Sequence, residues 1–182
     1  MVVPPAIEVP TLETARLRLR AHRADDLSAC LALWSDAEVV RYIGGQPSAK
    51  DAVWMRMMQY RGHWALTGYG YWLVEERATG AFVGEVGVAD FKRDLQPSIE
   101  GVPEAGWAIA TGKQGRGYAT EAVTGALAWV EANLDDPELA CIIDPANVAS
   151  LRVATKLDFR QVAHTTWRDL PTIVFRRPPR RG

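Results

Sequence analysis

The feature that most constrains the fold of this chain is an apolar run followed at once by a glycine-rich loop and a long helical pattern. Residues 107–110 read WAIA, and residues 112–122 read GKQGRGYATEA. Apolar side chains then recur at helical spacing from Val123 to Val130, in a segment that runs to about Asn133. A strand that ends in glycines and leads into a helix presents unpaired N–H groups and the positive end of the helix dipole. This arrangement predicts an anion site, for which phosphate is the natural occupant.

The glycines and cations of the loop fit such a site. Gly115 and Gly117 lack side chains that would hold a pyrophosphate away from the backbone, and Lys113 and Arg116 add positive charge at the rim. The segment contains neither GxGxxG nor GxxxxGK[ST], which disfavours a Rossmann site and a nucleotide-hydrolysing P-loop. Taken alone, the loop also fits a plain strand-to-helix turn whose glycines serve only backbone geometry.

Length and charge limit the classes of protein. A chain of 182 residues, 48% of them hydrophobic, can bury one sizeable core. We expect a single domain over residues 1–182, with its core at about 12–177 and a basic tail at 178–182. The formal net charge of −1 argues against a general nucleic-acid or membrane binder. Small molecules or a specific partner are favoured.

The two cysteines and the N-terminus bear on location and chemistry. Cys30 and Cys141 lie far apart, without a CxxC motif or neighbouring histidines, so no disulfide framework or zinc site is predicted. Neither cysteine lies in a motif typical of a nucleophile. The proline-broken start MVVPPAIEVP has no basic segment, and no apolar run reaches membrane-spanning length. These features favour a cytoplasmic protein.

Periodicity predicts an alternating order of elements, β-α-α-β-β-β-α-β-α-β-β. Strands are expected at 16–20, 68–76, 81–91, 104–110 and 139–143, with the last strands between 159 and 175. Helices are expected from about 25 to 34, from near 48 past Trp64, from the loop to about 133, and over 147–157. Leu17 and Leu19 are predicted to face inward.

Several motifs in this order resemble the GNAT superfamily of acetyl-CoA-dependent N-acetyltransferases. QGRGYA at 114–119 matches the Q/R-x-x-G-x-G/A signature of that family, in the strand-loop-helix setting that the family uses. More of the chain is similar to the RimJ/RimL-like branch, over residues 12–165 in order. The supporting segments are TARLRLR, RYIGG, GYGYWLV, GAFVGEVG, EAGWAI, GRGYATEAV, and N-x-x-S followed by KLDF. The resemblance implies an α+β fold, with a mixed, mostly antiparallel sheet flanked by helices and with splayed fourth and fifth strands.

The resemblance also implies acetyl-CoA as co-substrate and assigns residues to it. Backbone amides of the loop hold the pyrophosphate, the preceding strand bonds the pantetheine, and an asparagine at the start of the next helix contacts CoA. The loop residues are Gln114, Gly115, Arg116, Gly117, Tyr118, Ala119 and Thr120, the strand residues are Trp107, Ala108, Ile109 and Ala110, and the asparagine is Asn147. Asn147 also fits a plain helix N-cap, and the two roles can coexist. No metal is implied.

The chemistry requires a base for the amine and an acid for the thiolate. Glu104 matches the position at which many family members carry a catalytic glutamate, with an exposed edge residue as the alternative. The tyrosine that many members use as acid is replaced by Ala154, and Ser150 matches the serine of RimJ/RimL-like members. Ser150 alternatively bonds back into its own helix. Glu85 is expected as an acceptor-orienting carboxylate or a second-choice base.

The acceptor is less constrained than the co-substrate. Trp54, one position off the apolar stripe of its helix, is expected to contact the acceptor. The resemblance implies direct transfer to a primary amine, with a protein N-terminal α-amine favoured. Aminoglycosides and polyamines stay open as alternative acceptors. A non-catalytic CoA-binding regulatory module stays open as an alternative function, and self-association as a homodimer stays open as well. RNA binding by the arginine-rich end, RRPPRRG, is a further alternative to a plain solvated tail.

Overall fold

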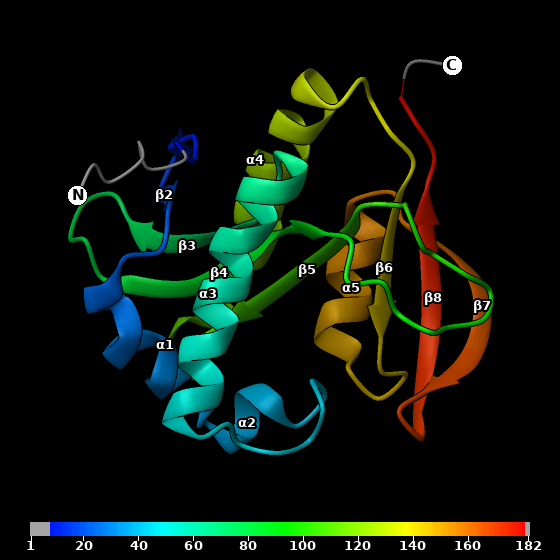
Figure 1. Ribbon diagram of the computed structural model, residues 1–182, viewed down its shortest axis with the longest axis horizontal. Coiled ribbons are helices and arrows are strands. Elements are labelled where there is room, and N and C mark those ends of the chain that lie inside the picture. Colours follow the sequence, from blue (N-terminus) through cyan, green and yellow to red (C-terminus); the bar gives the residue numbers. More distant parts are fainter. Residues whose placement is uncertain (1–7, 181–182) are drawn as a thin grey trace, which may run out of the picture.

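The structure is a computed structural model and describes residues 8–180. Its strands form one eight-stranded sheet in the order β1-β2-β3-β4-β5-β6-β8-β7 (Figure 1). The strands are β1 (Leu12–Glu13), β2 (Leu17–Arg20), β3 (Tyr71–Glu76), β4 (Phe82–Ala89), β5 (Glu104–Ile109), β6 (Leu139–Ile143), β7 (Arg160–Trp167) and β8 (Leu170–Arg177). Neighbouring strands pair antiparallel except β5 and β6, which pair parallel.

Helices cover both faces of the sheet. They are α1 (Leu27–Trp34), α2 (Ala37–Val40), α3 (Lys50–Thr67), α4 (Tyr118–Asn133) and α5 (Val148–Lys156), with short 3₁₀ turns η1 (Ala24–Asp26) and η2 (Thr111–Lys113). Successive strand residues face opposite sides, so Leu73 of β3 packs with α1 and α3 while Val74 packs with α4. Figure 1 shows α3 crossing in front of β3 and β4, with α4 partly hidden behind it.

The sheet divides between β5 and β6. The register joins the two strands at one residue pair, Glu104 with Ala140, and the Ala140 N–H donates to the Pro103 carbonyl at 3.1 Å. Beyond Glu104, the β6-facing edge of β5 has no strand partner in the described part of the chain. A strand edge of this kind exposes a row of N–H and C=O groups. The predicted splay of the fourth and fifth strands is therefore confirmed.

The predicted fold class and the order of the long elements are confirmed. Leu17 and Leu19 are fully buried as expected. β1 and α2 were not predicted, and the helix predicted at about 25–34 is η1 followed by α1. β1 has two residues and α2 has four, so neither contains enough of a repeat for periodicity to be read.

Part of the arginine-rich end belongs to the folded sheet. Arg177, in the last position of β8, is 2% exposed and pairs with Glu131 at 2.5 Å, while Arg176 pairs with Glu138. The expectation of a wholly solvated arginine cluster is wrong for these two residues. Residues 181 and 182 of the predicted tail lie outside the described part. No helix among residues 8–180 has the length and apolar character needed to cross a bilayer.

Candidate active site

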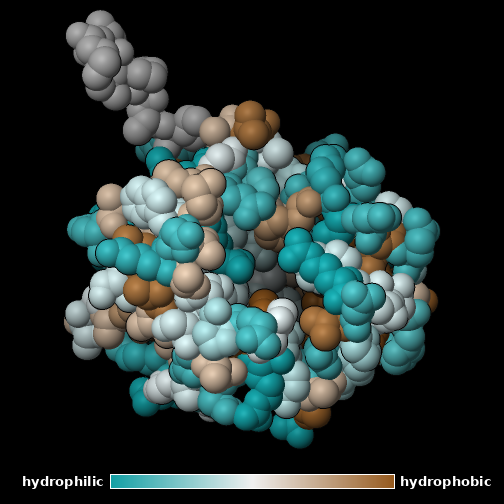
Figure 2. All heavy atoms as spheres, turned by 60° about the horizontal axis from the view of Figure 1, so that its bottom comes forward, coloured by the Kyte–Doolittle hydropathy of each residue, from teal (hydrophilic) through white to brown (hydrophobic). Residues whose placement is uncertain are grey.

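A cleft of about 1240 Å³ opens at the place where β5 and β6 separate. Its walls come from α3, the middle of β5, the first turn of α5 and the β7–β8 hairpin. Figure 2 shows the corresponding face hollowed near its middle, with hydrophobic residues beside the hollow and hydrophilic residues around it. Both predicted catalytic residues, Glu104 and Ser150, line this cleft, as do Trp107, Ala108 and Asn147.

Glu104, the predicted base, is a buried carboxylate held by an arginine. It is 4% exposed, which excludes the alternative of an exposed edge residue. Arg93 grips it with two hydrogen bonds, Nε to Oε2 at 2.5 Å and Nη2 to Oε1 at 2.9 Å. Burial raises the pKa of Glu104, and the Arg93 guanidinium opposes this only in part. The carboxylate therefore binds a proton more readily than an ordinary glutamate does.

The arginine is itself held in place by aromatic rings. Its guanidinium carbon lies 4.3 Å from the ring centroid of Trp167 and 4.7 Å from that of Phe91. Trp167 ends β7 and Phe91 follows β4, so the position of Glu104 depends on segments from both halves of the sheet. Sequence reasoning missed Arg93, because nothing local indicates that the loop after β4 returns to the start of β5.

Ser150, the predicted thiol partner, is bonded to the strand opposite and not to its own helix. The Trp107 Nε1–H donates to Ser150 Oγ at 3.2 Å. Asn147 caps α5 through its side-chain oxygen, which accepts from the Ser150 N–H at 3.0 Å. The N-cap role of Asn147 is thus confirmed. Because Ser150 Oγ accepts from Trp107, its own hydrogen is free to be donated elsewhere.

The glycine-rich loop has the backbone conformation that an anion site needs. Gly115 and Gly117 adopt left-handed φ angles of +73° and +78°, which other residues rarely do, and Gly117 is the N-cap of α4. A Cβ at Gly115 would meet nothing within 4 Å, so the space above the loop is open. The N–H groups of the first turn of α4 have no acceptor within the helix.

Side chains of the loop turn away from this open space. Lys113 Nζ and Tyr118 Oη both bond Glu76 Oε1, at 2.7 and 3.0 Å, and Gln114 Nε2 donates to the Ile109 carbonyl at 3.0 Å. The hydrogen bond from Lys113 is the main reason that the pKa of Glu76 falls to about 2. Lys113 is thus paired with Glu76, contrary to the expectation that it adds charge at the rim.

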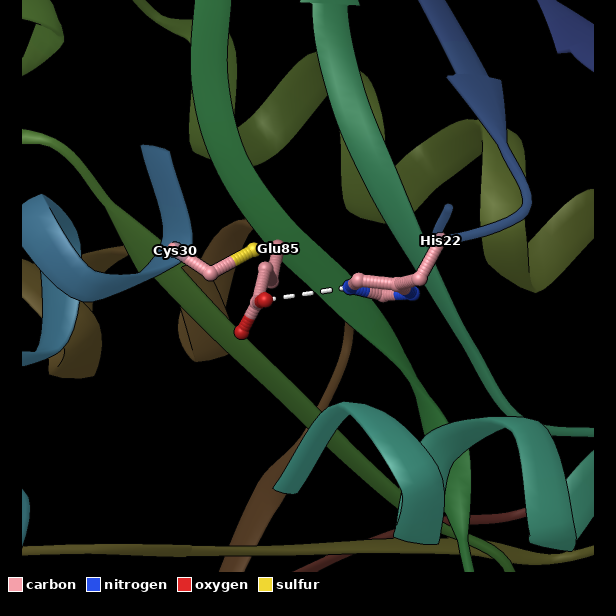
Figure 3. Close-up of side chains that lie close together, drawn as sticks. All are labelled: His22, Cys30 and Glu85. Atoms are coloured by element: carbon pink, nitrogen blue, oxygen red, sulfur yellow. Dashed lines mark hydrogen bonds and ion pairs between the residues drawn. The ribbon is translucent and has the colours of Figure 1, made fainter. Parts of the chain in front are cut away.

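Glu85 lies on the side of the sheet that α1 and α3 cover, and hydrogen-bond donors surround its carboxylate. It is fully buried in β4, and it accepts from Trp34 Nε1 at 2.7 Å and contacts His22 Nε2 at 3.0 Å. Figure 3 shows His22 and the Cys30 sulfur directed at the Glu85 side chain from opposite sides. Burial raises the pKa of Glu85, but hydrogen bonds from His22, Trp34 and Cys30 outweigh it and the pKa lies below its usual range.

His22, Cys30 and Glu85 also form a group of potential metal ligands, with their donor atoms within 4.8 Å of one another. Each atom already takes part in the hydrogen bonding of the Glu85 carboxylate. Burial and then the Glu85 charge raise the pKa of the Cys30 thiol, so it stays protonated and is a poor nucleophile. Both cysteines are free and buried.

Trp54 lies in a different place from the one expected. It is partly buried against the apolar cluster of α1 and α3, and Trp34 lines the cleft instead. Tyr71 forms part of the cleft wall that sequence reasoning missed. A Cβ at Gly106 would lie 2.1 Å from Tyr71 Oη, so the ring passes directly over the β5 backbone. The glycine in EAGWAI was the available signal, because a strand glycine often marks a close approach.

The fold and the site together define a class of protein. A glycine-rich loop with left-handed backbone stands at the N-terminus of α4 and follows the open edge of β5. A buried carboxylate, Glu104, and a serine, Ser150, line one cleft beside that edge, although the loop residues are not among its lining. Such a loop, strand edge, carboxylate and serine are the parts of an acyl-CoA-dependent acyltransferase. The loop fits a pyrophosphate, because the space at Gly115 is open and Arg16 Nη2 lies 3.5 Å from where a Cβ of Gly117 would stand.

Comparison with known proteins places the chain in a family within that class. The family description "Acetyltransferase (GNAT) domain" matches residues 16–160, so this protein belongs to that family and is an acetyl-CoA-dependent acetyltransferase. It is similar to the uncharacterized protein YkkB of Bacillus subtilis (strain 168), with 31% identity over 150 residues, which cover 80% of this chain and 83% of YkkB.

Solved structures support the same placement. The acetyltransferase from Agrobacterium tumefaciens str. C58 superposes with a TM-score of 0.80 at 26% identity, covering 97% of this chain and 99% of the other. An acetyltransferase from Salmonella typhimurium that modifies the N-terminal serine of ribosomal protein L7/L12 gives a TM-score of 0.73. Its identity is 13%, with 93% of this chain and 99% of the other covered, so this likeness shows the fold alone.

Proposed function

We propose that this acetyltransferase transfers the acetyl group of acetyl-CoA directly to a primary amine, with Glu104 as base and Ser150 as thiol partner. The observation that carries the proposal is that both residues line one cleft at the split between β5 and β6. When bound, acetyl-CoA supplies an activated thioester. The amine nitrogen forms the new bond to the acetyl carbon while the carbon–sulfur bond breaks, and no enzyme nucleophile is needed.

Glu104 has the properties of a base for an amine that is protonated at neutral pH. Its buried carboxylate has a raised pKa, closer to the operating pH than that of an exposed glutamate. Arg93 keeps the charged form accessible through its two hydrogen bonds. Glu104 takes the proton that the amine must lose before it attacks.

Ser150 stabilises the negative charge on the departing sulfur, and the backbone of β5 stabilises the oxyanion that develops on the acetyl group. Ser150 Oγ accepts from Trp107 and can donate a hydrogen bond to the leaving sulfur, while the thiolate takes up the proton that the attacking nitrogen loses. N–H groups on the open edge of β5 are fixed donors of the kind that stabilise an oxyanion. Ala154, at the position of the absent tyrosine, is fully buried and faces the core. Ser150 therefore takes the place of that tyrosine beside the leaving sulfur.

The composition of the cleft favours an α-amine at the end of a peptide over a polyamine or an aminoglycoside. A polycationic acceptor needs an excess of carboxylates, and the cleft has four of each sign. The lining cations are Arg56, Lys92, Arg93 and Arg168, and the lining carboxylates are Glu85, Asp94, Glu104 and Asp144. Exposed apolar side chains also line the cleft, namely Ile43, Met55 and Leu170. These features support placement in the RimJ/RimL-like branch and action on an N-terminal α-amine.

A regulatory module that binds CoA without turnover is the competing function. The retained pair of Glu104 and Ser150 in one cleft counts against it. The test is acetyl transfer to a panel of N-terminal peptides, spermidine and an aminoglycoside, with the product located by mass spectrometry. We expect acetylation of peptide α-amines at a kcat/KM at least about tenfold above the polyamine. Preferred acetylation of spermidine would overturn the peptide assignment, and binding of CoA with no acetylation of any amine would favour the regulatory module.

A further inference from the structure

The cleft wall contains one arginine, Arg56, whose Nε–H group is unpaired in the described part of the chain. Arg56 lies on α3 in the cleft wall, and its guanidinium carbon stacks 3.8 Å from the ring centroid of Trp34. The Nε atom is buried and has no hydrogen-bond partner among residues 8–180. A buried donor without an acceptor is costly to keep, so the Arg56 Nε–H calls for a partner.

Neighbouring charges of the cleft are already engaged. Arg93 is committed to Glu104 by two hydrogen bonds, and Lys92 pairs with Asp90 at 2.6 Å. Glu85, the carboxylate whose charge acts on Arg56, has its oxygens taken by His22 and Trp34. Arg56 itself shares a side-chain hydrogen bond with Tyr60, and Arg168, at the β7–β8 turn, stacks on Trp167. On the α3 wall, the Arg56 Nε–H is thus the cationic donor left without an acceptor among residues 8–180.

The stacking also gives Arg56 a fixed orientation. Trp34 is 4% exposed and is anchored by its bond to Glu85, so the plane on which the guanidinium rests is rigid. Val53 and Met57, on the same turns of α3, pack with Ala108 of β5 in one apolar cluster. Arg56 is thus held beside the strand along which the acetyl group is delivered. A planar fork held this way suits a carboxylate, which it can bind through two parallel hydrogen bonds.

We propose that Arg56 forms a carboxylate-binding subsite, so that the amine acceptor of this enzyme carries a carboxylate near the amine. The inference rests on the proposed function and narrows its substrate class. The carboxylate has two sources, the α-carboxylate of a free amino acid or an acidic side chain near the N-terminus of a peptide, and the kinetic experiment separates them.

The first test detects the subsite without turnover. The ¹⁵N-labelled protein with CoA bound is titrated with propionate or with propionamide, and the arginine Nε–H resonances are followed. The resonance of Arg56 is assigned by its loss in Arg56→Lys. We expect a saturable shift of this resonance with propionate at about 10 mM and none with propionamide. No shift, or equal shifts with both probes, would overturn the subsite.

The second test measures preference within matched pairs of acceptors. The pairs are the dipeptide amides Ala-Glu and Ala-Gln, and the free amino acid alanine with alaninamide. We expect the carboxylate member of one pair to have a kcat/KM at least about tenfold higher in the wild type, and that pair identifies the source. Arg56→Met should erase the preference and Arg56→Lys should keep part of it, while Arg160→Met, an exposed cation outside the cleft, should leave it unchanged.

The outcomes separate this inference from the proposed function. A propionate shift with no acetylation of any amine would leave the subsite standing and remove the acetyl transfer proposed above. Acetylation without preference in either pair would remove the subsite and leave the proposed acetyl transfer standing. A loss of stability in Arg56→Met with the preference intact would show that Arg56 serves only as a counter-ion for Glu85.

Discussion

At the scale of single residues, burial and Arg93 act in opposite directions on the pKa of Glu104. Burial raises the pKa of Glu104, and the hydrogen bonds and charge of Arg93 lower it, with burial the larger effect. Because both effects act on the Glu104 carboxylate, a change at Arg93 changes the pKa of Glu104. Arg93 touches no reacting atom and is a positioning residue, clamped by Trp167 and Phe91.

Substituting Arg93 should move the pH dependence of catalysis. Arg93→Met removes the interaction that lowers the pKa of Glu104, so this pKa rises further. The base must be deprotonated, and the acid limb of the kcat/KM profile should therefore shift to higher pH. Below the limb, kcat/KM should fall about tenfold per pH unit in both enzymes. The profile is measured by thiol release between pH 5.5 and 9.5, a range of about four pH units.

A conservative variant distinguishes this role from a structural one. Arg93→Lys keeps the charge while losing the fork, and its acid limb should lie between those of the wild type and Arg93→Met. A uniform drop in rate at every pH, with the limb unmoved, would show that Arg93 only holds the loop in place.

At the scale of elements, the strand-loop-helix unit from β5 to α4 is the part that sequence predicted best. Its glycines, its flanking apolar run and its helical stripe are all local features, and the structure places them as expected. Asp158 shows a similar local effect. It adopts a left-handed φ of +65° before Phe159, a conformation that glycine, asparagine and aspartate adopt more readily than other residues.

Contacts made across the fold could not be predicted in the same way. Arg93 reaches Glu104 from a loop whose path no local pattern fixes, and Trp107 reaches Ser150 across the β5–β6 split. Trp54, which was expected to contact the acceptor, packs against the apolar cluster, whereas the next two residues of α3, Met55 and Arg56, line the cleft. One helical position decides which side chain faces a cavity, and the apolar pattern does not fix it that closely.

The conformation of the loop predicts a matched pair of substitutions. Gly117→Ala at a φ near +78° costs roughly 1–2 kcal/mol. The free loop can relax away from this strain but a loop that holds the ligand cannot, so acetyl-CoA binding should weaken about tenfold. Gly112→Ala adds the same methyl group where nothing lies within 4 Å and should change the Kd by less than about twofold. Calorimetric titration with acetyl-CoA compares them. Equal affinity in both variants would mean that the left-handed glycine is dispensable for binding.

At the scale of the whole molecule, the co-substrate should act as a bridge between the two parts of the sheet. β5 and β6 share one residue pair, so little backbone pairing joins the parts at this point. Figure 1 shows β7 and β8 at the opposite end of the molecule from β2 and β3. A ligand lying along the open edge of β5 contacts both sides of the split.

This arrangement predicts a rise in thermal stability on binding. Acetyl-CoA at about 100 times its Kd adds about 2.7 kcal/mol to the free energy of unfolding. For a chain of this length, that free energy raises Tm by roughly 5–10 °C. Differential scanning calorimetry with and without acetyl-CoA measures the shift. A Tm unchanged at saturating ligand, or an equal rise in Gly117→Ala at the same ligand concentration, would contradict binding at this loop.

The central claim is that Glu104 acts as the base at the split of the sheet, and Glu104→Gln tests it most directly. The substitution keeps the shape of the side chain and removes its basicity. The measurement is kcat for thiol release at saturating acetyl-CoA and amine, with acetyl-CoA binding checked by calorimetry in the same samples. We predict a kcat lowered by about 10²–10⁴ with the Kd for acetyl-CoA nearly unchanged. Equal activity of Glu104→Gln and the wild type across the pH range would contradict the assignment.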